Sequence, residues 1–458
     1  MSDYDVVVIG TGTAGQSAAY ELKANGLTVA VVEKSTTPGG TCALAGCQAK
    51  KWFYEAAEIA AKANHLKGKG IVSAPQIAWA DLLKEKNKFT GAIPGGTLSG
   101  FKKAGIQVIT GTARFLNDHN LHVDGHKISA RFFVIATGAR PMALPIDGIE
   151  YAITSDQFLE LPSLPSRFVF IGGGFIAFEF AHFVARLGIG DSRKIIILEA
   201  APRPLGPFDA EMVSLLVAAS NKEGIDIRTG VNITALEKQG NAFKVLTDNG
   251  IAYDADTVVN VAGRQADIAD LDLKRAGIDF SRKGITVNTK MQTTQPHIYA
   301  VGDCAATIQL ARVADEEAMV AAESIVGKQN SANWPAMDYS AVPSVLFTYP
   351  QYGMVGATEE AIKAEGVSYR KSFGEHLTWP TYRRIGMTNA AYKILAGEDG
   401  TLLGAHILSD NATGIINTVR LAMLNQIPAE TLYRQGMMSP YPSRESDMLY
   451  MLKPLIRR

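Results

Sequence analysis

A strand, a glycine-rich turn and a helix occur twice in this chain of 458 residues. The first copy is Val6-Val7-Val8-Ile9-Gly10-Thr11-Gly12-Thr13-Ala14-Gly15, and the second is Phe168-Val169-Phe170-Ile171-Gly172-Gly173-Gly174-Phe175-Ile176-Ala177. In each copy, an apolar segment typical of a buried parallel strand leads into the glycines and then into an apolar helix. The duplication therefore predicts an α/β protein with two Rossmann-like, dinucleotide-binding folds.

The first copy contains Gly10, Gly12 and Gly15 at the spacing of a dinucleotide-binding turn, and we expect its helix over Gln16–Asn25. The glycines allow a tight turn, a close approach of the backbone to a pyrophosphate, and close packing of the helix on the strand. The N–H groups at the start of the helix then face the phosphates. The next predicted strand ends in Glu33, whose carboxylate can accept hydrogen bonds from a ribose diol.

The second copy contains Gly172 and Gly174, with Ala177 in place of the third glycine. Alanine still permits close packing of helix on strand. The following strand ends in Glu199, after a longer connection than usual. A carboxylate there accepts a hydrogen bond from the 2′-hydroxyl of NADH and repels the 2′-phosphate of NADPH, so the pattern favours NAD(H). We expect the nearby Arg203 to be a surface loop residue.

Two cysteines, Cys42 and Cys47, follow the first copy and are separated by four residues. A thiol pair beside a nucleotide cofactor indicates electron transfer, although spacing alone also allows two thiols that never pair. Cys304 is the third and last cysteine, and three cysteines cannot form a disulfide framework. We expect Cys304 to be a small core residue.

Charge and hydropathy exclude several classes of protein. Lys and Arg together number 45, as do Asp and Glu, so no basic face for nucleic acid or an anionic membrane is indicated. No apolar segment reaches the roughly 18–20 residues that span a bilayer. Residues 1–5 lack the pattern of a secretory signal. We expect a cytoplasmic protein with neither a nucleic-acid partner nor a membrane partner.

Further motifs extend to the C-terminal part, among them Ala136-Thr137-Gly138, Val301-Gly302-Asp303 and Leu403-Gly404-Ala405-His406. In these motifs the chain resembles the pyridine nucleotide-disulfide oxidoreductases, such as dihydrolipoamide dehydrogenase, glutathione reductase and mercuric reductase. The resemblance implies FAD at the first copy, NAD(H) at the second, and a C-terminal α+β dimerisation domain of a homodimer. The expected domains are a discontinuous FAD-binding domain at 1–148 and 270–333, an NAD(H)-binding domain at 149–269, and an interface domain at 334–458.

The resemblance also implies roles for single residues. Cys47 would lie beside the flavin, and Cys42 would meet the substrate. Lys51 matches the family's lysine near the flavin, and Glu179 matches the carboxylate partner of that lysine. The positions expected to bind FAD or NAD(H) are Gly10, Gly12, Gly15, Glu33, Lys34, Gly40, Thr41, Thr137, Gly138, Asp303, Gly172, Gly174, Glu199 and Gly263.

The C-terminal motif departs from the family pattern. The family usually has a histidine there, which acts as a base toward the substrate thiol, and a glutamate that orients it. In this chain Tyr441 stands at the histidine position and Ser446 at the glutamate position, with Glu445 one residue out of register. No histidine follows His406. A general base contributes about 10²–10⁴-fold in rate, and tyrosine is a poor base at neutral pH.

We infer that the path from NADH through FAD to the disulfide is intact, and that the departures alter the step from the disulfide to the acceptor. We predict an FAD-dependent NADH:disulfide oxidoreductase with Cys42, Cys47, Lys51, Glu179 and Tyr441 as catalytic residues. Its acceptor would be a metal ion, a quinone, a sulfur compound or a thiol of low pKa. Two alternatives remain open: a dihydrolipoamide dehydrogenase that uses Tyr441 instead of histidine, and a flavin-based redox sensor or regulatory subunit.

Three histidines, His119, His122 and His126, lie close together in the sequence. Their spacing is typical of short strands joined by turns, with the histidines on exposed faces. No metal site is predicted.

Overall fold

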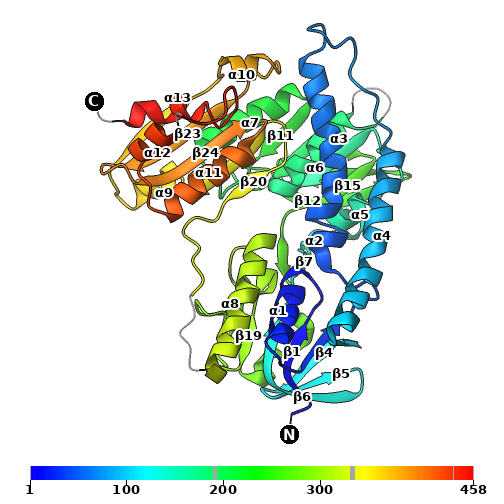
Figure 1. Ribbon diagram of the computed structural model, residues 1–458. Coiled ribbons are helices and arrows are strands. Elements are labelled where there is room, and N and C mark those ends of the chain that lie inside the picture. Colours follow the sequence, from blue (N-terminus) through cyan, green and yellow to red (C-terminus); the bar gives the residue numbers. More distant parts are fainter. Residues whose placement is uncertain (1, 189–192, 331–335, 437, 457–458) are drawn as a thin grey trace. The chain divides into compact units, whose positions relative to one another are not determined.

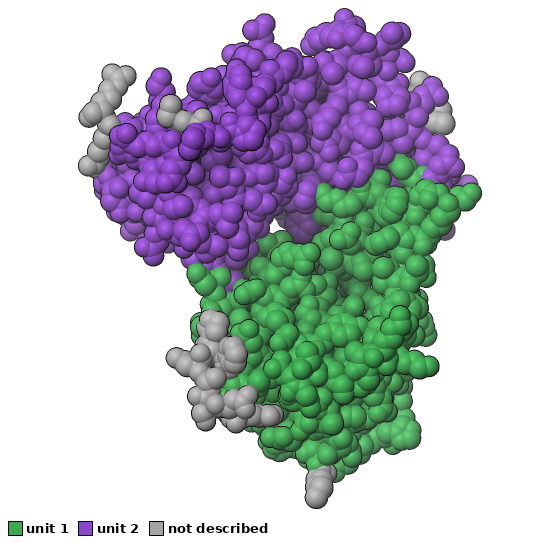
Figure 2. Space-filling model, viewed as in Figure 1, with its two compact units in different colours: residues 1–52, 82–142, 263–338 green, residues 53–81, 143–262, 339–458 purple. Residues whose placement is uncertain are grey.

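The computed structural model describes residues 2–188, 193–330, 336–436 and 438–456. The chain forms two compact units, which Figure 2 colours separately. The first unit contains residues 1–52, 82–142 and 263–338, and the second contains residues 53–81, 143–262 and 339–458. No helix within the described ranges is long and apolar enough to cross a membrane.

A seven-stranded sheet forms the centre of the first unit (Figure 1). Its strands are β1 (Tyr4–Ile9), β2 (Val29–Glu33), β3 (Gln107–Thr110), β4 (Ala113–Asn117), β5 (Asn120–Val123), β6 (His126–Ile135) and β19 (Ile298–Ala300). The order is β3-β2-β1-β6-β5-β4, and β19 also pairs with β6. Strands β3, β2, β1, β6 and β19 are parallel, whereas β4 and β5 form antiparallel pairs next to β6. The side chains of Val6, Val7 and Val8 are fully buried, as expected for a parallel strand covered on both faces.

Helices and short strands complete the first unit, and two of the helices extend into the second. They are α1 (Thr13–Ala24), α2 (Gly40–Leu44), α3 (Cys47–His65), α4 (Trp79–Ala104), α8 (Ala311–Asn330), the short helices η2 (Ala269–Leu271), η3 (Leu273–Ala276) and η4 (Gly302–Cys304), and the paired strands β7 (Ala139–Pro141) with β16 (Arg264–Ala266) and β17 (Phe280–Ser281) with β18 (Gly284–Ile285).

Helix α1 begins three residues before the predicted Gln16. The reason is that Gly12 has an extended backbone (φ −70°, ψ −174°) and forms the N-cap inside the glycine motif.

The second unit contains another parallel sheet, of order β11-β10-β9-β15-β8. Its strands are β8 (Ile153–Thr154), β9 (Arg167–Ile171), β10 (Lys194–Glu199), β11 (Ile225–Thr229) and β15 (Thr257–Asn260), accompanied by η1 (Ile149–Tyr151), α5 (Ser155–Phe158), α6 (Phe175–Arg186), α7 (Ala210–Lys222) and the antiparallel strands β12 (Ile233–Gln239), β13 (Ala242–Thr247) and β14 (Ala252–Ala255). The two parallel sheets, each with a glycine turn after a buried strand, confirm the predicted pair of Rossmann-like folds.

The C-terminal part of the second unit is an antiparallel sheet of order β20-β21-β24-β23-β22. Its elements are β20 (Ser344–Leu346), β21 (Gln351–Gly356), β22 (Tyr369–Gly374), β23 (Ala391–Gly397), β24 (Leu402–Ser409), α9 (Glu359–Ala364), α10 (Pro380–Arg383), α11 (Ala412–Leu424), α12 (Ala429–Gly436), α13 (Met448–Leu452) and η5 (Lys453–Leu455). Helix α11 packs on β21 and β24. This α+β arrangement agrees with the predicted fold class.

An ion cluster around a buried lysine joins the C-terminal sheet to α7. Lys393, fully buried in β23, places its Nζ 2.7 Å from Asp209 Oδ1, 2.8 Å from Glu211 Oε2 and 2.8 Å from Glu359 Oε2. Asp209 is also the N-cap of α7. A buried charge is stable only when it is paired in this way. The cluster helps to explain why the parallel sheet and the C-terminal sheet form one compact unit, although the sequence assigned them to separate domains. The three domain boundaries stay a prediction.

Candidate active site

Three parallel strands of the first unit carry the predicted FAD motifs at their carboxyl ends. Gly10 follows β1, Thr137 follows β6, and Asp303 follows β19, and these strands are neighbours in the sheet. Ligands of open α/β sheets bind at this edge. The hydroxyl of Thr137 is buried without a hydrogen-bond partner, and the Asp303 carboxyl makes no hydrogen bond within the described part of the chain. Burial raises the pKa of Asp303, and nearby Arg264 partly opposes the shift. Such polar groups fit a polyhydroxylated ligand such as FAD.

The two predicted ribose-binding carboxylates hold their glycine turns in the same way. Glu33 Oε2 accepts a hydrogen bond from the backbone N–H of Thr11 at 2.9 Å, and Glu33 Oε1 accepts one from Ser35 at 2.8 Å. Glu199 Oε2 accepts from the N–H of Gly173 at 2.6 Å, and Glu199 Oε1 from Ala201 at 2.7 Å. In each copy, therefore, the carboxylate orients the residue between the first two glycines. Each ionised carboxylate has further lone pairs, which a ribose hydroxyl can use.

Thr11 connects the first glycine turn to the cysteine segment, a role that the sequence did not reveal. Its hydroxyl donates to Glu33 Oε2 at 2.5 Å and accepts from the N–H of Gly39 at 3.0 Å. The side chain is fully buried. The equivalent residue in the second copy is Gly173, which has no side chain. The difference between the two copies at this position is the sequence signal that could have pointed to Thr11.

The structure brings Cys42 and Cys47 together. Cys42 lies in α2, and Cys47 is the first residue of α3. Between them, Gly46 returns close to α2, because a Cβ atom at Gly46 would lie 2.8 Å from the carbonyl oxygen of Thr41. Both cysteines are in the thiol form, with Cys42 half-buried and Cys47 exposed. This is the arrangement from which two sulfurs can form a disulfide without moving the backbone far.

The surroundings of the two sulfurs favour ionisation of one of them at a time. A hydrogen bond with Cys47 is the largest cause of the raised pKa of Cys42, followed by burial, and the Asp315 carboxylate adds to the shift. The Thr13 hydroxyl acts in the opposite direction. Cys47 stands at the N-terminus of a 19-residue helix, where the helix dipole favours a thiolate. One sulfur of the pair can therefore keep its proton while the other, as a thiolate, is the nucleophile.

In the second unit, Gly172 and Gly174 follow β9 and precede α6, and Glu199 ends β10. Arg203 donates hydrogen bonds to the carbonyl oxygens of Phe208 at 2.7 Å and Gly206 at 2.8 Å. Its guanidinium group is thus committed to its own loop and is not directed to a bound phosphate. This observation agrees with the expectation that Arg203 is a loop residue.

Comparisons with known proteins agree with these two nucleotide folds. Residues 4–318 match the pyridine nucleotide-disulphide oxidoreductase family, and residues 342–448 match the dimerisation domain of that family. The chain belongs to the pyridine nucleotide-disulphide oxidoreductases. It is therefore an oxidoreductase of the flavoprotein disulfide reductase type and carries the family's dimerisation domain.

Individual relatives of this oxidoreductase cover almost all of its length. A dihydrolipoyl dehydrogenase from Thermus scotoductus is 32% identical over an alignment of 449 residues, which covers 92% of this chain and 91% of the relative. A mercuric reductase from Staphylococcus aureus is 30% identical over 440 residues, 94% of this chain and 79% of the relative. The Cu(II) complex of the HOCl-induced flavoprotein disulfide reductase RclA from Escherichia coli is similar in structure, with a TM-score of 0.88, 26% identity and full coverage of both chains.

The remaining predicted site residues of this oxidoreductase lie in different environments. Lys51 is one helical turn after Cys47 in α3, on the same side of the helix. Lys34 Nζ pairs with Asp267 at 2.8 Å. Glu179 is buried in α6 of the second unit, where its Oε1 accepts a hydrogen bond from the Phe347 N–H at 2.9 Å. The pairing of Lys51 with Glu179 stays a prediction. The other predicted contact positions, Thr41, Gly138 and Gly263, lie in α2, after β6 and after β15.

The C-terminal motif places no base beside Tyr441 among the residues that the structure describes. The Tyr441 side chain is 79% exposed, in the connection between α12 and α13. Glu445 Oε1 accepts a hydrogen bond from Asn411 Nδ2 at 2.7 Å instead of approaching the tyrosine. Ser446 exchanges hydrogen bonds with Ser443, because its hydroxyl donates to the Ser443 carbonyl at 2.7 Å and its N–H donates to the Ser443 hydroxyl at 3.1 Å. The motif thus forms a turn that Glu445 ties to Asn411, and its acid does not orient a proton acceptor at position 441.

The Glu199 carboxylate is expected to set the choice between NADH and NADPH. Changing Glu199→Gln removes the negative charge that repels a 2′-phosphate and keeps one acceptor oxygen, so that one of the two backbone hydrogen bonds, from Gly173 or Ala201, is lost with the charge. We expect the ratio of kcat/KM for NADH over NADPH to fall about tenfold, mainly through a lower KM for NADPH, which corresponds to about 1.4 kcal/mol. Steady-state kinetics with both coenzymes measures this ratio.

The matched control is Glu237→Gln, which removes the same charge from an exposed position on β12. The ratio should stay unchanged in this control. An equal fall in both variants would mean that net charge, not the position of Glu199, determines the preference.

Proposed function

We propose that this protein uses NADH and FAD to reduce the Cys42–Cys47 disulfide and then passes the two electrons to a thiophilic metal ion, such as Cu(II) or Hg(II). Binding of FAD at β1, β6 and β19, and of NADH at β9 and β10, is part of this proposal, and so are the roles of the two cysteines. The bound flavin supplies the hydride-accepting and electron-passing chemistry. The dimerisation domain supports a homodimer.

Two features together support a metal ion as the acceptor. The two thiols are in contact, and position 441 holds no oriented base. A disulfide acceptor receives two protons together with two electrons, so its reduction benefits from a positioned acid and base. A metal ion receives electrons alone, and a thiolate binds it directly. In the net reaction, NADH and two Cu(II) ions give NAD⁺, one proton and two Cu(I) ions, while the two thiols become a disulfide and are reduced again. Two of the similar proteins, a mercuric reductase and a Cu(II) complex of RclA, have such metal ions in their names.

The test compares acceptors under anaerobic conditions with the flavin-loaded protein. NADH oxidation is followed with Cu(II), Hg(II), oxidised lipoamide and glutathione disulfide, and Cu(I) is trapped by a coloured chelator. We expect kcat/KM for Cu(II) or Hg(II) to exceed that for either disulfide by at least about 10²-fold, because reduction of a disulfide would lack a general base, whose contribution to the rate is at least of that size. Faster turnover with lipoamide would instead support a dihydrolipoamide dehydrogenase.

Substitutions at Tyr441 distinguish that alternative further. We expect Tyr441→His to raise lipoamide turnover by about tenfold to a hundredfold, since it restores a base without its orienting acid, and to leave Cu(II) turnover unchanged. Tyr441→Phe removes only the hydroxyl and should leave both rates unchanged. A loss of lipoamide turnover in Tyr441→Phe would mean that the tyrosine hydroxyl itself handles the proton.

A further inference from the structure

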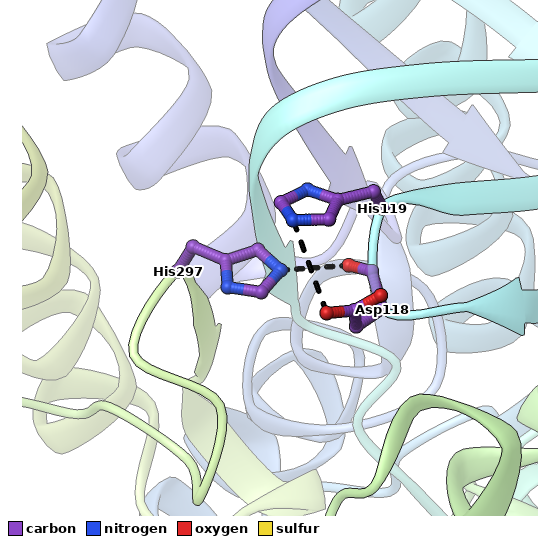
Figure 3. Close-up of side chains that lie close together, drawn as sticks. All are labelled: Asp118, His119 and His297. Carbon is purple, nitrogen blue, oxygen red and sulfur yellow. Dashed lines mark hydrogen bonds and ion pairs between the residues drawn. The ribbon is translucent and has the colours of Figure 1, made fainter.

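Asp118, His119 and His297 form a cluster of possible metal ligands that the redox site does not use. Asp118 and His119 lie in the turn between β4 and β5, and His297 immediately precedes β19. The three ligand atoms all lie within 4.8 Å of one another (Figure 3). Residues more than 170 positions apart in the chain thus meet at one point, which the spacing of His119, His122 and His126 did not suggest.

Among the described residues, the cluster leaves the Asp118 carboxylate and His119 Nε2 without a hydrogen bond, whereas His297 Nε2 has one. The rings of His119 and His297 are stacked, with centroids 4.2 Å apart and planes inclined by 14°. His297 Nε2 lies 2.8 Å from the carbonyl oxygen of Asp118 and donates to it, because a carbonyl only accepts. His119 Nε2 is 3.8 Å from Asp118 Oδ2, which is too long for a hydrogen bond (Figure 3). The Asp118 carboxylate accepts no hydrogen bond from any residue in the described ranges.

We propose that Asp118, His119 and His297 bind one divalent transition-metal ion of the Zn(II), Ni(II) or Cu(II) class. Two imidazoles and one carboxylate are the ligand set that these ions accept, whereas Mg(II) and Ca(II) prefer oxygen ligands alone. Metal–ligand bonds of about 2.0–2.2 Å would span the gap between His119 and Asp118, and His297 would bind the ion through a ring nitrogen that carries no proton. His119 is exposed, and the other two residues are half-buried, so the ion can enter from solvent and the side chains can adjust.

The metal site would be distant from the FAD motif. His297 lies at the amino end of β19 and Asp303 beyond its carboxyl end, and the extended residues 298–301 between them span roughly 13 Å. A bound ion would join the β4–β5 turn to the start of β19, the strand that leads to Asp303. It would therefore stabilise the folded first unit by binding to it, and it would not take part in electron transfer.

The test is a calorimetric titration of Zn(II) into the flavin-loaded protein with Cys42 and Cys47 oxidised to the disulfide. Oxidation removes the two accessible thiols as competing ligands, and Cys304 is fully buried. We expect one Zn(II) per chain, with binding weakened at least tenfold in each of His119→Ala and His297→Ala. The matched control is His126→Ala, an exposed histidine of the neighbouring hairpin, which should bind like the unmodified protein.

A second readout uses Cu(II), whose electron paramagnetic resonance spectrum reports bound nitrogen ligands. We expect the signature of two imidazole nitrogens in the unmodified protein and of one in each histidine variant, with the flavin absorbance unchanged as evidence of folding. Unchanged Zn(II) affinity in His119→Ala would overturn the proposal. Equal weakening in His126→Ala would do the same, since it would indicate adventitious binding to surface histidines. Neither result depends on the identity of the electron acceptor.

Discussion

Replacing Cys42 by serine is expected to lower NADH-dependent reduction of the acceptor by at least about a thousandfold, within the range seen when a catalytic nucleophile is removed. Serine is similar in shape, but it cannot form a disulfide and is not a thiolate at neutral pH. NADH should still reduce the flavin, because the nucleotide sites do not include Cys42. Steady-state turnover and a single reductive half-reaction measure the two effects separately.

Cys304→Ser is the matched control for this experiment. Cys304 is fully buried, as the sequence predicted, and its sulfur donates to the carbonyl oxygens of Ile135 and Val301, each at 3.3 Å. A serine hydroxyl can donate to the same acceptors, so turnover should change little. Continued rapid acceptor reduction in Cys42→Ser would show that electrons leave the flavin without passing through the cysteines.

Gly40→Ala is expected to yield protein without bound flavin and with reduced stability. Gly40 has a φ of +76°, and a Cβ atom there would lie 2.3 Å from the Cα of Gly12. The left-handed conformation costs an alanine about 1–2 kcal/mol, and overpacking of two backbones adds about 1–3 kcal/mol. The glycine turn would be displaced from the phosphate-binding position. Flavin absorbance of the purified protein and its thermal unfolding measure the two consequences.

Gly26→Ala provides the comparison, because Gly26 also has a positive φ (+84°) but has open space around its Cβ position. We expect Gly26→Ala to lose only the stability that the left-handed conformation costs an alanine and to keep its bound flavin. Normal flavin content in Gly40→Ala would contradict the assignment of this turn to the cofactor.

Local patterns in the sequence were enough to predict the two nucleotide folds. The alternation of a buried strand, a glycine turn and a helix is set within about 30 residues, so the sequence alone placed Glu33 and Glu199 at strand ends. The meeting of Cys42 and Cys47 also follows from residues close in the chain. In contrast, the start of α1 inside the glycine motif depends on the backbone of Gly12, which no side-chain pattern shows.

Contacts between distant segments could not be predicted. The hydroxyl of Thr11 finds its partners at Glu33 and Gly39 only after the turn and the cysteine segment have packed together. In the same way, His297 reaches Asp118 only because β19 pairs with β6 in the sheet. Tertiary pairing of this kind leaves no periodic signal in a single sequence.

The most direct test of the central claim, that electrons pass from NADH through the flavin to the Cys42–Cys47 pair, is an anaerobic titration of the flavin-loaded protein with NADH. The visible spectrum is recorded after each addition. A long-wavelength charge-transfer band that appears with the first equivalent is the predicted result, because a Cys47 thiolate would then lie beside oxidised flavin. Bleaching of the flavin without that band would contradict the account, since it would mean that the two cysteines do not exchange electrons with the cofactor.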